Sequence, residues 1–97
     1  MSEYEITFYD FTKVSDSEEI KSIVTELSKE GDAEQTGSGA DLTGRKTVYD
    51  VSWLIRTNIT LKSILSLFKN YPRFQSSAWD IELHDIENDE FHFSINS

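Results

Sequence analysis

Residues 77–97 read SAWDIELHDIENDEFHFSINS, and apolar residues alternate with polar ones in two runs of this stretch. The apolar residues of the two runs are Trp79, Ile81, Leu83, Phe91, Phe93 and Ile95. Alternation with a period of two is typical of half-buried strands. The stretch is therefore predicted to form a β-hairpin.

The parity of these apolar residues predicts the register of the hairpin. Both sets occupy odd positions, and a slip of one residue would turn a whole set of side chains to the other face. Odd residues must then pair with odd residues if both sets face one core. We predict an odd-length loop, Glu87-Asn88-Asp89, with Leu83 opposite Phe93 and Ile81 opposite Ile95.

The outer face of the predicted hairpin is acidic. The same register places His84 opposite His92, with Glu82 beside them. The hairpin carries six carboxylates and no Lys or Arg: Asp80, Glu82, Asp85, Glu87, Asp89 and Glu90. A charge run of this kind either solvates an exposed face or presents a rigid anionic surface that attracts a basic partner.

Length and composition limit the class of protein. With 97 residues and a hydrophobic content of 37%, the chain is predicted to form one globular domain over residues 1–97. It has no cysteine, so disulfides and thiolate chemistry are excluded. It has no basic start followed by an apolar segment, and no apolar run of membrane-spanning length. We therefore expect a cytoplasmic protein.

Charge is distributed unevenly along the chain, whose formal net charge is −9. Residues 1–44 carry a net −8, residues 45–75 a net +5, and residues 76–97 a net −6. A chain this acidic should repel nucleic acid over most of its surface. The basic middle segment either neutralises acids of the flanking segments within the fold or forms a separate basic patch.

Two further strands are predicted upstream of the hairpin. Residues 4–11 alternate between apolar and polar positions until Phe11, which breaks the parity at the strand exit. Residues 46–55 carry an apolar face and two further apolar residues, Val48 and Leu54, on the other face. Apolar residues on both faces favour an interior strand.

Two helices are predicted over residues 16–30 and 59–71. The first has an apolar stripe of Ile20, Ile23, Val24 and Leu27, and Gly31 is expected to end it. The second has a stripe of Leu61, Ile64, Leu65 and Phe68, with a cap at Asn58 or Thr60 and a stop at Pro72. The outer face of the first helix, with Glu26 and Glu30, could extend an anionic surface.

The glycine-rich residues 31–45 are predicted to form a long loop, either a binding loop or a flexible connection. The element order is then β-α-β-α-β-β. This order predicts an α+β two-layer sandwich, in which two helices cover one face of a mostly antiparallel four-stranded sheet.

Signatures of catalysis or of a cofactor are weak. Residues 39–46 approach a phosphate-binding loop, but they precede a strand and not a helix. His84, His92 and Glu82 resemble a two-histidine, one-carboxylate metal set. Both histidines lie in the hairpin. Catalytic carboxylate pairs need a pocket that makes their two pKa values differ, and the outward face of a hairpin offers no evident pocket. We expect no enzyme activity, no metal and no cofactor.

The size, acidity, lack of cysteine and α+β pattern of the chain resemble those of immunity proteins, which protect bacteria from nuclease toxins of the bacteriocin or contact-dependent growth inhibition type. The resemblance implies a cytosolic inhibitor that binds one basic toxin domain. From the residues themselves we expect no direct contact with nucleic acid, because the chain is acidic, and none with membrane, because no apolar run is long enough. The weak catalytic signatures predict no small-molecule substrate.

The residues predicted to contact such a partner are Asp80, Glu82, His84, Asp85, Glu87, Asp89, Glu90 and His92, with Glu26 and Glu30 as secondary contacts. Two alternatives remain open. One is a nucleic-acid mimic encoded by a phage or mobile element, such as an anti-restriction or anti-CRISPR protein. The other is a structural or regulatory subunit that oligomerises through a sheet edge or through the face that carries the tryptophans.

Overall fold

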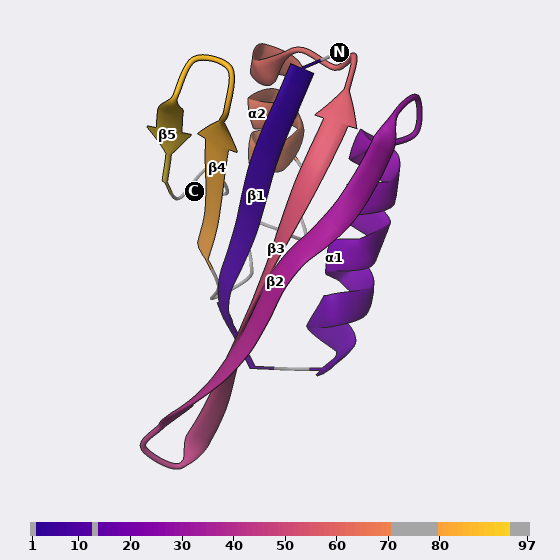
Figure 1. The fold of residues 1–97 in the computed structure, drawn as a ribbon. Coiled ribbons are helices and arrows are strands. Elements are labelled where there is room, and N and C mark those ends of the chain that lie inside the picture. The colour runs from indigo at the N-terminus through magenta and orange to yellow at the C-terminus, as the bar shows by residue number, and fades with distance from the viewer. Residues whose placement is uncertain (1, 13, 71–79, 94–97) are drawn as a thin grey trace.

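The computed structural model describes residues 2–12, 14–70 and 80–93 (Figure 1). Along the chain the elements are β1 (Ser2–Phe11), α1 (Val14–Leu27), β2 (Asp32–Thr43), β3 (Lys46–Thr57), α2 (Leu61–Asn70), β4 (Asp80–Asp85) and β5 (Glu90–His92). The five strands form one antiparallel sheet in the order β2-β3-β1-β4-β5. The predicted α+β class is confirmed, but the predicted four-stranded sheet is wrong, because β2 was not expected.

The strands are connected as two interlocked β-α-β units. Strands β1 and β2 are both antiparallel to β3, which lies between them, so they run parallel to each other and are joined through α1. Strands β3 and β4 are likewise both antiparallel to β1 and are joined through α2. This is the connectivity of the ferredoxin-like, split β-α-β arrangement, with β5 added beyond β4.

One face of the sheet packs against both helices. Tyr4, Ile6 and Phe8, the even-numbered residues of β1, are buried together with the apolar stripes of both helices in a single core. Figure 1 shows α1 and α2 on the same side of the sheet. The prediction that two helices cover one face is therefore confirmed, and the other face has no helix over it among the described residues.

Both helices form where their apolar spacing predicts them. All four stripe residues of α1 are buried, and Ile64 and Phe68 of α2 are completely buried. The Thr60 Oγ1 accepts a hydrogen bond from the Ser63 backbone N–H at 3.3 Å, which caps α2 as one of the two predicted alternatives. Pro72 lies outside the described residues. Within those residues, neither helix combines the length and the hydropathy needed to cross a lipid bilayer.

The end of β1 contains the irregularity that its sequence predicts. The register with β3 shifts between Phe8 and Phe11, and Asp10 between them has a φ of 62°. This left-handed residue turns Phe11 back toward the core, where the side chain is 6% exposed and stacks on Tyr49. Phe8 and Phe11 are three positions apart and would face opposite sides of a regular strand. The irregularity at Asp10 lets both be buried on the same side.

The predicted loop over residues 31–45 is wrong, because most of it is β2, which pairs with β3 from Asp32 to Thr43. Its glycines and acids have low strand propensity, and its few apolar residues do not alternate with polar ones along its length, so the sequence does not indicate a strand. Backbone pairing with β3 holds it instead. The two strands join through a two-residue turn in which Gly44 has a φ of 66°, and glycine in the first position is typical of a type II′ hairpin turn.

The predicted register of the C-terminal hairpin is also wrong. Leu83 pairs with His92, and His84 pairs with Phe91, so odd residues face even ones. The connection comprises residues 86–89, an even-length turn, and not the predicted loop of three residues. Because of this slip, Phe91 and Phe93 point away from the core. Trp79 and Ile95, which the prediction placed in the core, lie outside the described residues.

Candidate functional site

The helix-free face of the sheet forms the largest continuous surface built from several strands. Strand register arranges its outward residues in cross-strand rows, four of which include residues of β1. Asp41, Val48 and Lys46 continue the same face where the β2–β3 hairpin extends beyond β1. Three rows are Asp32–Arg56–Glu3, Glu34–Leu54–Glu5–His84–Phe91 and Ser52–Thr7–Glu82. The fourth is the pair Tyr9–Asp80 together with Asp50 of β3, whose charge acts on Tyr9 beside the irregularity of β1. We call the residues of these four rows the open face.

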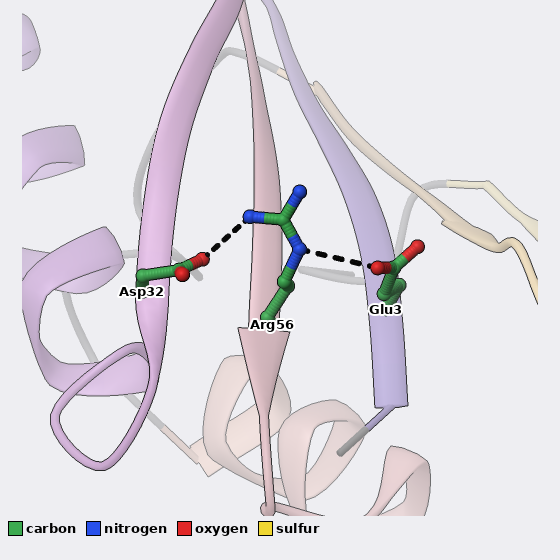
Figure 2. Close-up of polar contacts among 3 residues, drawn as sticks. All are labelled: Glu3, Asp32 and Arg56. Atoms are coloured by element: carbon green, nitrogen blue, oxygen red, sulfur yellow. Dashed lines mark hydrogen bonds and ion pairs between the residues drawn. The ribbon is translucent and has the colours of Figure 1, made fainter.

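The first row is an ion-pair network across three strands (Figure 2). The Arg56 Nε lies 3.1 Å from Glu3 Oε1, and the Nη1 lies 2.8 Å from Asp32 Oδ1. Hydrogen bonds to Asp32 and then to Glu3 raise the pKa of Arg56 above its ordinary value. The only arginine in the four rows is therefore already bonded to two carboxylates.

Negative charge dominates the rest of the open face. Its seven carboxylates are Glu3, Glu5, Asp32, Glu34, Asp50, Asp80 and Glu82, and they come from four different strands. The four rows contain no lysine, and Lys46 follows on the same side of β3, next to the β2–β3 turn. Because paired strands hold these side chains at fixed spacing, the face presents a preformed negative potential to an approaching protein.

Tyr9 and Glu82 connect the third and fourth rows. The Tyr9 hydroxyl donates a hydrogen bond to Glu82 Oε2 at 3.3 Å. Burial, followed by the charge of Glu82, raises the pKa of Tyr9 above its ordinary value of 10.0. The negative charge of Asp50 also raises the pKa of Tyr9, so the Asp50 carboxylate lies close enough to interact with the phenol.

This pKa shift predicts a loss of stability in alkali. Below pH 10.0 the phenol is protonated in both folded and unfolded chains, so its stabilising contribution is fully present. The contribution is lost as the pH rises through the raised pKa of the folded state. The unfolding free energy, measured by denaturant titration above pH 10.0, should therefore fall less steeply in Tyr9→Phe than in the wild type. Equal slopes would contradict the assignment.

The predicted partner-contact residues of the hairpin do not form one surface. Asp80, Glu82 and His84 lie on the open face, as expected. Asp85 points into the core and is 3% exposed, so its prediction as a surface contact is wrong. Its carboxylate accepts hydrogen bonds from the Asn88 backbone N–H at 3.4 Å and from Asn88 Nδ2 at 2.9 Å, which fixes the turn.

The other acids of the hairpin surround its turn. Glu87, Asp89 and Glu90 are exposed. Asp89 Oδ1 lies 3.0 Å from His84 Nε2, so the turn contacts the edge of the open face. Glu26 lies on α1 and Glu30 lies in the turn after it, and both are exposed. Helix α1 lies on the side of the sheet opposite the open face (Figure 1).

The predicted pairing of the two histidines is wrong. His84 belongs to the open face, whereas His92 pairs with Leu83 and lies on the helix-covered side. They cannot share one ion with Glu82, and no cluster of three metal-ligating side chains exists within the described residues. Residues 39–46 form strand, turn and strand, without the helix that a phosphate-binding loop must open.

Several residues of the open face were not identified from the sequence. Glu3 and Glu5 alternate with the buried Tyr4 and Ile6, so the signal for these two acids was present in the pattern of β1. Asp32 and Glu34 give no such signal, because the glycine-rich sequence around them predicts a loop. Their position depends on pairing with β3.

A groove of about 540 Å³ lies on the other side of the sheet, between α1 and the β2–β3 hairpin. Its walls include Lys21 of α1, Ala40 of β2, and Val51 and Trp53 of β3. Trp53 packs against the core, as predicted. The residues that line the groove include no histidine.

Compared with protein-family models, with curated proteins and with solved structures, the chain matches none of them.

Proposed function

We propose that this protein binds a basic protein through the open face and thereby blocks that partner, as an immunity protein blocks a nuclease toxin. The observation that carries the proposal is the charge of the open face. Its seven carboxylates share four rows with a single arginine, and that arginine is bonded to Asp32 and Glu3. Nuclease active sites are cationic because they hold phosphates, so a negative surface suits them.

The rigidity of the open face supports this role. Its carboxylates project from paired strands, and cross-strand hydrogen bonds such as Thr7 Oγ1 to Ser52 Oγ, at 2.9 Å, fix neighbouring side chains. Preorganised charges lose little conformational entropy when a partner binds. They also raise the association rate by steering the encounter, and the gain falls as salt is added.

A charge-reversal experiment tests the proposal. The double variant Glu5→Lys/Glu82→Lys changes two adjacent rows in the middle of the open face. Close charge pairs at such interfaces contribute roughly 1.5 kcal/mol or more each, so affinity for a basic partner should fall by about 100-fold. The measurement is affinity capture of a basic polypeptide from a lysate of the source cell, followed by binding titration of the isolated partner.

The matched control is Glu26→Lys/Glu30→Lys, which changes the net charge equally but lies on α1 and in the turn after it. This control should retain the partner. If both double variants lose it equally, net charge and not the open face determines binding. If a retained partner is a DNA-binding defence complex, the nucleic-acid mimic replaces the immunity role.

A further inference from the structure

One corner of the open face is aromatic and exposed. We define this aromatic corner as Tyr9, His84, Phe91 and Phe93. Phe91 is 60% exposed and Phe93 is 67% exposed, although both are large apolar side chains. The even-length turn between β4 and β5 causes this exposure, because it pairs Phe91 with the outward His84. Clustered apolar surface of this kind commonly marks an interaction site.

The aromatic corner contains two similar units. In one, Phe91 stacks on His84 with ring centroids 4.0 Å apart, and His84 Nε2 lies 3.0 Å from Asp89 Oδ1. In the other, Phe93 stacks on Tyr9 with centroids 6.3 Å apart, and the Tyr9 hydroxyl donates to Glu82. Each unit therefore has an exposed ring, a second ring stacked on it, and a carboxylate.

This combination of groups suits a cation with a flat, weakly hydrated surface. The face of an aromatic ring attracts a cation through its quadrupole, and arginine stacks on rings more readily than lysine does. A carboxylate at the edge of the ring can accept the guanidinium N–H groups as a fork. An acidic or nucleic-acid partner would instead be repelled by the seven carboxylates of the open face.

We propose that the aromatic corner binds arginine side chains of the basic partner, with guanidinium groups stacked on Phe91 and Phe93 and hydrogen-bonded to Asp89 and Glu82. The inference rests on the proposed function, because it names the residue type that the open face selects. Charge alone would bind lysine and arginine equally. The aromatic corner makes the face selective for arginine.

Homopeptides of arginine and of lysine, equal in length and charge, are the probes for this selectivity. Titration calorimetry with the full chain should give an arginine-peptide affinity a few-fold higher than that of the lysine peptide, since arginine stacks on exposed rings more readily than lysine does. The variant Phe91→Ala/Phe93→Ala should lose that preference, with lysine-peptide affinity changed by less than about twofold. Leu42→Ala, which truncates an apolar side chain that is 80% exposed on β2, should change neither affinity.

The variant Phe91→Leu/Phe93→Leu separates ring stacking from simple apolar contact. It should behave like the alanine variant, because leucine keeps apolar surface but has no ring quadrupole. Full arginine preference in the leucine variant would overturn the inference. Equal binding of the two peptides by the wild type would overturn it too, while the proposed function would stand if Glu5→Lys/Glu82→Lys weakened both. Failure of the wild type to bind either peptide would count against both proposals.

Discussion

Replacement of Gly31 by alanine is expected to lower the unfolding free energy by about 3 kcal/mol, at the upper end of the cost of overpacking a well-packed site. A Cβ at Gly31 would overlap the backbone carbonyl oxygen of Arg56 and lie 2.9 Å from its carbonyl carbon. These are backbone atoms of an interior strand, which cannot rotate away as a side chain could. Glycine is required here for close approach, and not for a left-handed φ.

The effect of Gly31→Ala should reach the open face. Arg56 supplies the guanidinium that links Asp32 and Glu3, so displacement of its backbone would disturb the first row. Guanidinium chloride unfolding, monitored by tryptophan fluorescence, measures the stability change. Nuclear magnetic resonance signals of the Arg56 guanidinium show whether its ion pairs with Glu3 and Asp32 are kept.

Gly37→Ala is the matched control for this substitution. Gly37 also lies in the β2 region, but a Cβ there meets no atom within 4 Å. Alanine should be neutral or stabilising by up to about 1 kcal/mol, since it reduces the entropy of the unfolded chain. Similar losses in the two variants would show that the contact with Arg56 is not the cause.

Replacement of Phe68 by alanine is expected to cost about 3–5 kcal/mol, the usual range for a buried phenylalanine. Phe68 on α2 is completely buried, and its ring meets Phe8 of β1 edge-on with centroids 6.5 Å apart. Since small domains have a total stability of roughly 5–15 kcal/mol, this one change removes much of it. Thermal unfolding followed by circular dichroism should show a large drop in Tm.

Two further variants identify the source of this loss. Phe68→Leu keeps apolar volume but removes the ring pair, so its cost should be clearly smaller than that of alanine. Leu42→Ala removes a side chain that is 80% exposed and should change stability by less than about 0.5 kcal/mol. A cost below about 1 kcal/mol for Phe68→Ala would contradict the packing of α2 onto the centre of the sheet.

The acidic character of the candidate site could be predicted in part. Asp80, Glu82 and His84 were placed outward correctly, because alternation within β4 is a local pattern. Asp85 was assigned to the acidic surface because of its charge, although it occupies an odd position like Ile81 and Leu83. Its pairing with Tyr4 puts it on the core side, as that alternation implies. The contributions of Asp32 and Glu34 could not be predicted, since they depend on a pairing with β3 that no local pattern encodes.

The aromatic corner could not be predicted from the sequence, because the direction in which Phe91 and Phe93 point depends on the length of the turn between β4 and β5. The odd positions of Phe91 and Phe93 suggested that they join Ile81 and Leu83 in the core. An even-length turn reverses that assignment, because one residue more or less moves every side chain of β5 to the other face. Asn88 donates hydrogen bonds to the Asp85 carboxylate within this turn. That carboxylate is buried because Asp85 pairs with Tyr4 of β1, a contact between distant segments.

The sequence by itself determined both helices, the interior position of β3, the alternation of β1 and β4, and the net negative charge. These features depend on residue periodicity and composition, which act over one or two turns of helix or a few strand residues. Only the tertiary structure decided that residues 32–43 form a strand, that Phe91 faces outward, and that acids of four strands share one face. The physical reason is that strand pairing joins distant segments through backbone hydrogen bonds, which are nearly independent of side-chain identity.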